Sequence, residues 1–218
     1  MSEVPRLLRS RLLLLAVLVI AVASCSDDDS GSSSSPGSSP ADSAPLELET
    51  YQGDGFSMLL PAGWTIVTAA DVDFTTLFED AGDFADSEAL VQQVTAAFEQ
   101  GGKLFAIDLS TAASGFATTI NIIELPLPAL TIAEVEAVTV QQFEDLVGAS
   151  DVSSEIRTLP AGEAAVVSYR MPAYGNQGIG VTLLTESTQW VITLSALDLS
   201  PLSDAFWTMI ESFRESAQ

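Results

Sequence analysis

Carboxylates are the only catalytic side chains that this chain carries in surplus. Its 218 residues include 30 aspartates and glutamates, seven lysines and arginines, and no histidine. Without histidine, neither a Ser-His nor a Cys-His catalytic pair can form, and the common histidine-containing zinc sites are excluded as well. Two facing carboxylates would still suffice to hydrolyse a glycosidic bond, because one serves as the acid and the other as the nucleophile or base.

Acids that could form such a pair fall in two segments of the chain. They are Asp80, Asp83 and Asp86 in the first segment, and Glu134, Glu136, Glu144 and Asp145 in the second. With so many acids, close pairs also arise by chance, and a catalytic pair needs a pocket that perturbs its pKa values. Asp80, Asp83, Asp86 and Glu88 together could bind calcium weakly. The simpler interpretation is that these acids stand at the start of a helix and complement its dipole. We expect no catalytic residue, no metal site and no cofactor.

Two other features have a chemical and a structural interpretation. Lys103 could be a catalytic amine if it were desolvated, but its position after two glycines favours a charged residue at the edge of a sheet. The glycine-rich stretch 175–180 lacks the strand-to-helix context of a phosphate-binding loop. We expect this stretch to be a flexible hairpin loop between two strands.

The only cysteine, Cys25, ends an N-terminal segment that has the form of a secretory signal. Three arginines precede an unbroken apolar run at 12–22, and the small residues Ala23 and Ser24 stand directly before the cysteine. The run is too short to span a membrane. The segment resembles the lipobox of bacterial lipoproteins. This resemblance implies that 1–25 is a signal peptide and that Cys25 carries a lipid, which anchors the protein to a membrane of a bacterial envelope on its extracytoplasmic side.

Residues 26–45 contain no aromatic and no large aliphatic side chain, so we expect a disordered tether. Its root-mean-square reach would be about 25 Å. The triple aspartate at 27–29 could be taken for a calcium site, but a solvated run of charges is the simpler interpretation because no calcium-loop spacing follows it. The tether would hold the folded domain away from the bilayer.

The charge of the chain excludes one class of partner. After the signal, four basic residues stand against 29 acidic ones, a formal charge of −25. Nucleic-acid binding needs lysine or arginine to replace the counterions of phosphate, and anionic lipid headgroups would repel the chain for the same reason. We therefore expect no nucleic-acid partner, and contact with the membrane only through the lipid on Cys25.

Residues 46–218 have the composition and length of a single domain. Alternating apolar residues predict a hairpin over 55–67, which turns at Pro61–Gly63. Helical periodicity and capping signals predict helices over 87–100, from Thr131 to about Val147, and from a Ser200 cap with Pro201 in the first position. A shorter helix is expected around Phe74–Phe78. The remaining predicted strands are 104–109, 116–125, 154–159, 163–171, 178–186 and 189–197.

The first strand carries the sequence Phe-x-x-x-x-Pro-x-Gly-Trp, with Phe56, Pro61, Gly63 and Trp64. It resembles the start of PsbP-like domains, which include the LpqN-type lipoproteins of actinobacteria and the DcrB-type lipoproteins. The resemblance implies an α+β fold in which a central, mainly antiparallel β-sheet is sandwiched by α-helices. It also implies an accessory, scaffolding or binding role, and it supplies no catalytic residue.

The last predicted helix has an apolar stripe that should close the core. Its members are Leu202, Phe206, Met209, Ile210 and Phe213. Trp207 would lie at the edge of this stripe, either as a boundary core residue or as a contact for a partner. A cavity between a helix and the sheet could bind an apolar small molecule or a segment of a protein partner, with Phe74, Phe78 and Trp207 near its mouth. The alternative is a fully packed core that recognises partners through its outer surface.

The sequence therefore predicts a membrane-anchored extracytoplasmic lipoprotein with a non-catalytic domain that binds a ligand or a partner. The alternative function is a carboxylate-based hydrolase that acts on an envelope polymer. Two facing, desolvated carboxylates at the base of a cleft would favour the hydrolase.

Overall fold

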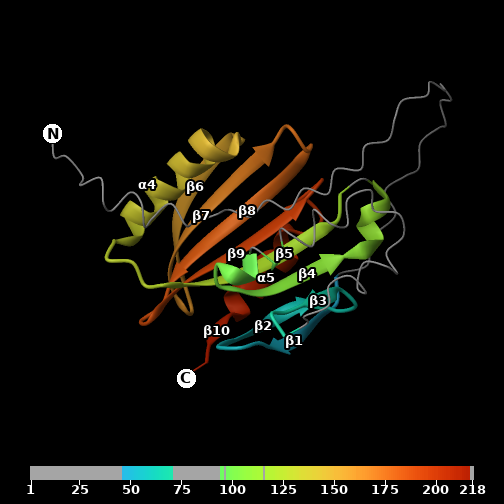
Figure 1. Cartoon of the computed structure of the whole chain (residues 1–218), viewed down its shortest axis with the longest axis horizontal. Coiled ribbons are helices and arrows are strands. Elements are labelled where there is room, and N and C mark those ends of the chain that lie inside the picture. Colours follow the sequence, from blue (N-terminus) through green and yellow to red (C-terminus); the bar gives the residue numbers. More distant parts are fainter. Residues whose placement is uncertain (1–45, 71–93, 96, 115, 217–218) are drawn as a thin grey trace.

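A computed structural model describes residues 46–70, 94–95, 97–114 and 116–216. The predicted signal peptide, the tether and the short helix around Phe74–Phe78 lie outside the described residues. A seven-stranded antiparallel sheet, which we call the large sheet, forms the centre of the described part (Figure 1). Its strands, in spatial order, are β3 (Thr65–Val67), β4 (Gly102–Asp108), β5 (Thr118–Pro126), β9 (Thr188–Ala196), β8 (Asn176–Leu184), β7 (Gly162–Met171) and β6 (Ser150–Leu159).

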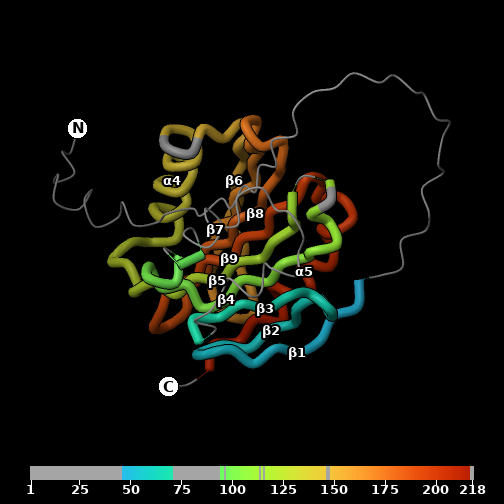
Figure 2. Tube along the Cα trace, turned by 45° about the vertical axis from the view of Figure 1, so that its right-hand side comes forward, coloured from blue at the N-terminus to red at the C-terminus, as the bar shows by residue number. Residues whose placement is uncertain are grey.

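A second, smaller sheet joins the two ends of the described chain. It has three strands in the order β1 (Leu48–Gln52), β2 (Phe56–Pro61) and β10 (Arg214–Glu215). Figure 2 shows the blue β1 and β2 side by side, with the red C-terminal segment close to them. The helical elements are η1 (Leu109–Ser114), α4 (Ile132–Gln142), its continuation η2 (Phe143–Val147) and α5 (Ser203–Ser212), and residues 94–95 and 97–99 are helical as well.

Helices cover both faces of the large sheet. On one face, apolar side chains of the sheet pack against α5 and the small sheet. On the other face, Val94 and Ala97 pack on β4, while α4 and η2 pack on β7. This arrangement confirms the predicted α+β fold with a central antiparallel sheet between helices, and it adds a small sheet that the sequence did not predict.

Three aromatic side chains form the centre of the core. Phe56 of β2, Trp190 of β9 and Phe213, which follows α5, are each at most 1% exposed. The Phe56 and Phe213 rings are stacked with their centroids 5.9 Å apart, and the Trp190 ring lies 5.3 Å from Phe213 and 5.6 Å from Phe56. Aromatic pairs at such separations contribute about 0.5–1.5 kcal/mol beyond the burial of their area.

The final helix has the predicted apolar stripe but a different start. Phe206, Met209 and Ile210 of α5 are buried, as predicted. The helix begins at Ser203 rather than at Pro201. Leu202 occupies the N-cap position, and its side chain makes no capping hydrogen bond. The Ser200 N–H instead donates to the Asp198 carboxylate in the preceding turn.

The helix α4 begins as the sequence predicts. The Thr131 hydroxyl accepts from the Glu134 N–H, while the Glu134 carboxylate accepts from the Thr131 N–H at 2.9 Å. These reciprocal bonds satisfy donors that the first turn of a helix leaves free. The helical run ends at Gly148, whose φ of 70° places it in the left-handed region.

The hairpin predicted over 55–67 is wrong. β2 pairs with β1 and β10 in the small sheet, whereas β3 pairs with β4 in the large sheet. Gly63, with a φ of 78°, turns the chain from one sheet to the other. The alternation of apolar and polar residues predicts strands but not which strands pair. Any two amphipathic strands can pair if their apolar side chains face the same core.

The stripe of α5 gives a stability test. Phe206→Ala should lower the free energy of unfolding by about 3–5 kcal/mol, because it leaves a cavity at a fully buried position. Leu197→Ala, at a position 36% exposed, is the control and should change it by about 0.5 kcal/mol or less. Denaturant unfolding followed by circular dichroism measures both. Equal effects of the two substitutions would show that α5 is peripheral to the core.

Candidate ligand-binding face

The three central strands of the large sheet are apolar on one side and polar on the other. In β5, for example, Ile120 and Ile122 belong to the main apolar cluster, while Thr119 and Asn121 alternate with them and point to the opposite side. We call this second side the polar face. It comprises Thr119, Asn121, Asn176, Thr182, Gln189, Thr193 and Ser195, whose exposed fractions lie between 1% and 4%.

The strand register places these side chains in rows across the sheet. Thr119 lies opposite Ser195, and Asn121 lies opposite Thr193. On the far side of β9, the partners of Ser195 and Thr193 are Gly178 and Gly180. Side chains directly opposite each other in an antiparallel pair have Cβ atoms about 4.5–5.5 Å apart. Hydroxyl and amide groups therefore gather in the middle of a buried sheet face.

Two aromatic side chains lie over the glycines of β8. The Tyr169 ring of β7 covers Gly178, where an added Cβ would overlap the ring, and the Phe143 ring of η2 approaches Gly180. The two aromatic rings contact each other, with their centroids 4.2 Å apart. The predicted hairpin loop over 175–180 is therefore wrong beyond Gly175. Gly178 lies within β8, and because it has no side chain, the Tyr169 ring can lie across it.

Several polar atoms on this side of the sheet are buried without a partner. The Tyr169 hydroxyl, both amide atoms of Asn176 and the Gln189 Nε2 have no well-aligned hydrogen bond to any residue that the structure describes. Burial raises the pKa of the Tyr169 hydroxyl to about 12, and the Ser195 hydroxyl opposes this rise only in part. An unsatisfied buried polar group costs about 1–3 kcal/mol. A bound polar molecule would remove this cost.

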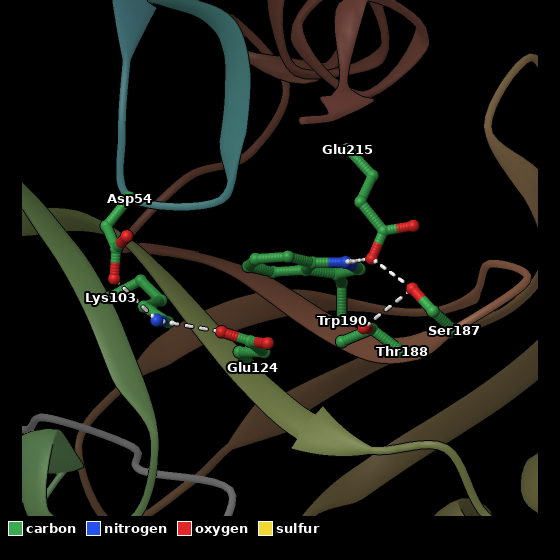
Figure 3. Close-up of polar contacts among 7 residues, drawn as sticks. All are labelled: Asp54, Lys103, Glu124, Ser187, Thr188, Trp190 and Glu215. Atoms are coloured by element: carbon green, nitrogen blue, oxygen red, sulfur yellow. Dashed lines mark hydrogen bonds and ion pairs between the residues drawn. The ribbon is translucent and has the colours of Figure 1, made fainter. Parts of the chain in front are cut away.

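Lys103 lies at the start of β4, beyond the residues that pair with β3, and it joins the two sheets. β4 is flanked by β3 and β5, and the Lys103 ammonium lies 2.8 Å from the carboxylates of both Asp54 and Glu124 (Figure 3). Desolvation lowers the pKa of Lys103, but the hydrogen bonds to these two acids outweigh it and leave the pKa raised. A raised pKa keeps the amine protonated, which is the opposite of what a nucleophilic lysine needs. The predicted edge charge is therefore a bridge.

Glu215 makes a second bridge between the sheets. Its carboxylate accepts from the Ser187 hydroxyl at 3.0 Å and from the Trp190 indole N–H at 3.4 Å (Figure 3). Desolvation raises the pKa of Glu215, but hydrogen bonds from the turn between β8 and β9 and from Trp190 lower it overall. The carboxylate thus fixes β10 to the end of the β8–β9 hairpin.

In the described part of the chain, every carboxyl group whose pKa is shifted is held in its ionised form. The pKa is lowered for Asp54, Glu134, Asp198 and Glu215, and hydrogen bonds are the cause that lowers it in each case. A general acid requires the opposite shift. In the same part of the chain no group of three potential metal ligands occurs. The predicted candidates Asp80, Asp83, Asp86 and Glu88 lie outside the described residues.

Trp207 lies away from the polar face. It is half-buried on α5 and packs at the edge of the apolar cluster, as predicted, with the Arg157 guanidinium carbon 3.8 Å from its ring centroid. This cluster occupies the opposite side of the large sheet, so Trp207 shares no site with Asn121 or Tyr169. The other expected site residues, Cys25, Phe74 and Phe78, lie outside the described residues.

The polar face has a signal in the sequence, although no motif indicates it. In β5, β8 and β9, threonine, serine, asparagine or glycine alternates with isoleucine, leucine or valine. Such alternation normally marks strands with one side in water. Only the structure reveals that the polar residues of these strands are buried as well.

The shifted pKa of Tyr169 gives a test by pH. Because the folded pKa of about 12 exceeds the ordinary value of 10.0, the unfolded chain ionises first as the pH rises. The contribution of Tyr169 to stability is therefore complete below about pH 10 and is lost between about pH 10 and 12, by roughly 2–3 kcal/mol. Denaturant unfolding of wild type and Tyr169→Phe over this range should show the loss in wild type alone. Parallel curves would place the hydroxyl in water.

Comparisons with known proteins give a likeness of fold. No family model and no curated protein matches the chain. A similar solved structure is the solution structure of cyanobacterial PsbP (CyanoP) from Synechocystis, with 15% sequence identity and a TM-score of 0.49. The match covers 84% of this chain and 100% of that one. A likeness of this size assigns no activity and no partner. Within the ranges that the structure describes, no helix is long and apolar enough to cross a membrane.

Proposed function

We propose that this protein is a lipid-anchored extracytoplasmic lipoprotein of a bacterial envelope, and that its folded domain binds a ligand or a segment of a partner without catalysis. The N-terminal signal that ends at Cys25 supports the anchor. The Phe56–Trp64 motif supports a PsbP-like domain of the kind found in LpqN-type and DcrB-type lipoproteins.

The polar face is the observation that carries the binding role. Three buried side chains on this side of the sheet, those of Tyr169, Asn176 and Gln189, carry polar atoms with no well-aligned hydrogen bond to any described residue, and such atoms reduce the stability of the fold. Their uncharged donors and acceptors suit a neutral polar ligand, such as one that presents hydroxyl or carbonyl groups. This chemistry differs from the apolar ligand that the sequence predicts, because the predicted cavity was to be lined by aliphatic and aromatic side chains.

A non-catalytic role agrees with the state of the described acids and of Lys103. The shifted carboxyl groups are held as anions, and the lysine is held as a cation. These groups serve as bridges within the fold. The carboxylate-based hydrolase is therefore not a second proposal. Turnover of a glycan or an ester by the purified protein would reveal such an activity.

The lipid anchor can be tested at Cys25. Cys25→Ser should abolish the incorporation of a labelled fatty acid and release the protein from the membrane unless the uncleaved signal retains it, because Cys25 is the residue to which the lipobox resemblance assigns the lipid. Fractionation of the host and fluorography measure both effects, with wild type as the reference. Fatty-acid label that persists in the variant would rule out this anchor.

The binding role can be tested with two matched tyrosine variants. Tyr169→Phe removes the unpartnered hydroxyl on the polar side, and Tyr174→Phe removes one at a position 44% exposed. Protein purified from its native membrane should carry a copurifying small molecule or peptide, detected by native mass spectrometry. Tyr169→Phe should reduce its occupancy about tenfold, equivalent to the loss of about 1.4 kcal/mol of binding free energy.

The same pair of variants distinguishes a binding role from a structural one. Because the Tyr169 hydroxyl makes no well-aligned hydrogen bond to a described residue, Tyr169→Phe should keep or raise the melting temperature, and Tyr174→Phe should leave both occupancy and melting temperature unchanged. A fall of several degrees in Tyr169→Phe would show that the hydroxyl supports the fold. Equal occupancy in all three proteins would remove the polar face as the binding site.

A further inference from the structure

Among the residues that the structure describes, the strand β6 forms one edge of the large sheet and has one unpaired side. It pairs with β7 alone, and its ten residues make it as long as any strand of the sheet. From Ser153 to Leu159 the pairing with β7 is regular, while the register shifts between Ser150 and Ser153. One side of this regular stretch therefore presents backbone N–H and C=O groups to a further strand.

Three neighbouring side chains in the middle of β6 are exposed: one is acidic, one is apolar and one is basic. Ile156 is 43% exposed, which is unusual for a large aliphatic residue within a strand of this sheet. It is flanked by Glu155 and Arg157, whose side chains are 52% and 40% exposed and form an ion pair with each other. The order acid, isoleucine, base is unusual here, since only four basic residues follow the signal.

This order makes the strand complementary to itself when it runs antiparallel to a second copy. With Ile156 opposite Ile156 of the other copy, each Glu155 lies opposite an Arg157. Opposite charges across a strand pair are favourable, and the two isoleucines cover each other on the other side of the sheet. Ser154 would then lie opposite Thr158, so that no like charges meet within the regular stretch.

We propose that two copies of this chain pair antiparallel along β6, about a two-fold axis that passes through Ile156. A symmetric interface of this kind uses the same patch on both copies. The pairing joins the two large sheets into one and covers the free edge of each. Because both copies are strongly acidic, long-range repulsion opposes the contact, and the dimer forms more readily at about 0.15 M salt, where the Debye length is about 8 Å.

The position of the axis can be tested by disulfide formation in the full chain within its own membrane. Ile156→Cys places two thiols opposite each other, whereas in Thr158→Cys the thiols are displaced by about 13 Å along the strands, too far for a disulfide. We expect Ile156→Cys to cross-link at least about tenfold faster than Thr158→Cys, with the unaltered chain as the control for Cys25. Equal rates would overturn the proposed register.

The charge pairing can be tested by exchange of the two charges. Glu155→Arg and Arg157→Glu each bring like charges together, so each should weaken self-association in sedimentation experiments by about tenfold or more. A mixture of the two variants restores both opposite-charge pairs and should form a heterodimer as tight as the wild-type dimer. Circular dichroism melting curves verify that the variants are folded. Self-association that persists in both single variants, or a mixture that does not associate, would overturn the proposal.

Discussion

The contact among Phe56, Trp190 and Phe213 is the interaction on which the rest of the structure depends. It brings together the second strand of the domain, the central strand β9 and the residue that follows the last helix. Glu215 and Lys103 then add polar bridges at two places around this contact. The small sheet is thereby fixed to the apolar side of the large sheet, which leaves the other side of the same strands free to carry a different chemistry.

That division explains the unusual composition of β5, β8 and β9. Each strand contributes aliphatic residues to the main core from one side. The opposite side contains Asn121 and Gly180, although asparagine and glycine are disfavoured in strands. A protein that loses stability at one place and regains it at another commonly does so where it binds a ligand. The polar face is therefore the side of the large sheet at which we propose that a ligand binds.

Much of the fold could be predicted from local signals, and the site could not. The capping box at Thr131 and the stripe of α5 involve residues three or four positions apart, so a short stretch of sequence is enough to predict them. The strand β7 was predicted to within one residue, because glycine and proline mark the turn before it. By contrast, β1 and the pairing of β2 with β10 depend on residues far apart in the chain. Asn121 is 2% exposed, although the alternation of polar and apolar residues in a strand normally indicates that one side is in water.

The small sheet has a consequence for how the protein is made. β2 lies between β1, which precedes it, and β10, which ends the described chain, and the Ser216 N–H bonds to the Gly55 carbonyl at 2.9 Å. The central aromatic contact also needs Phe213. Neither can form while the C-terminal residues are still in the ribosome. The chain therefore remains without its completed core until its synthesis has ended.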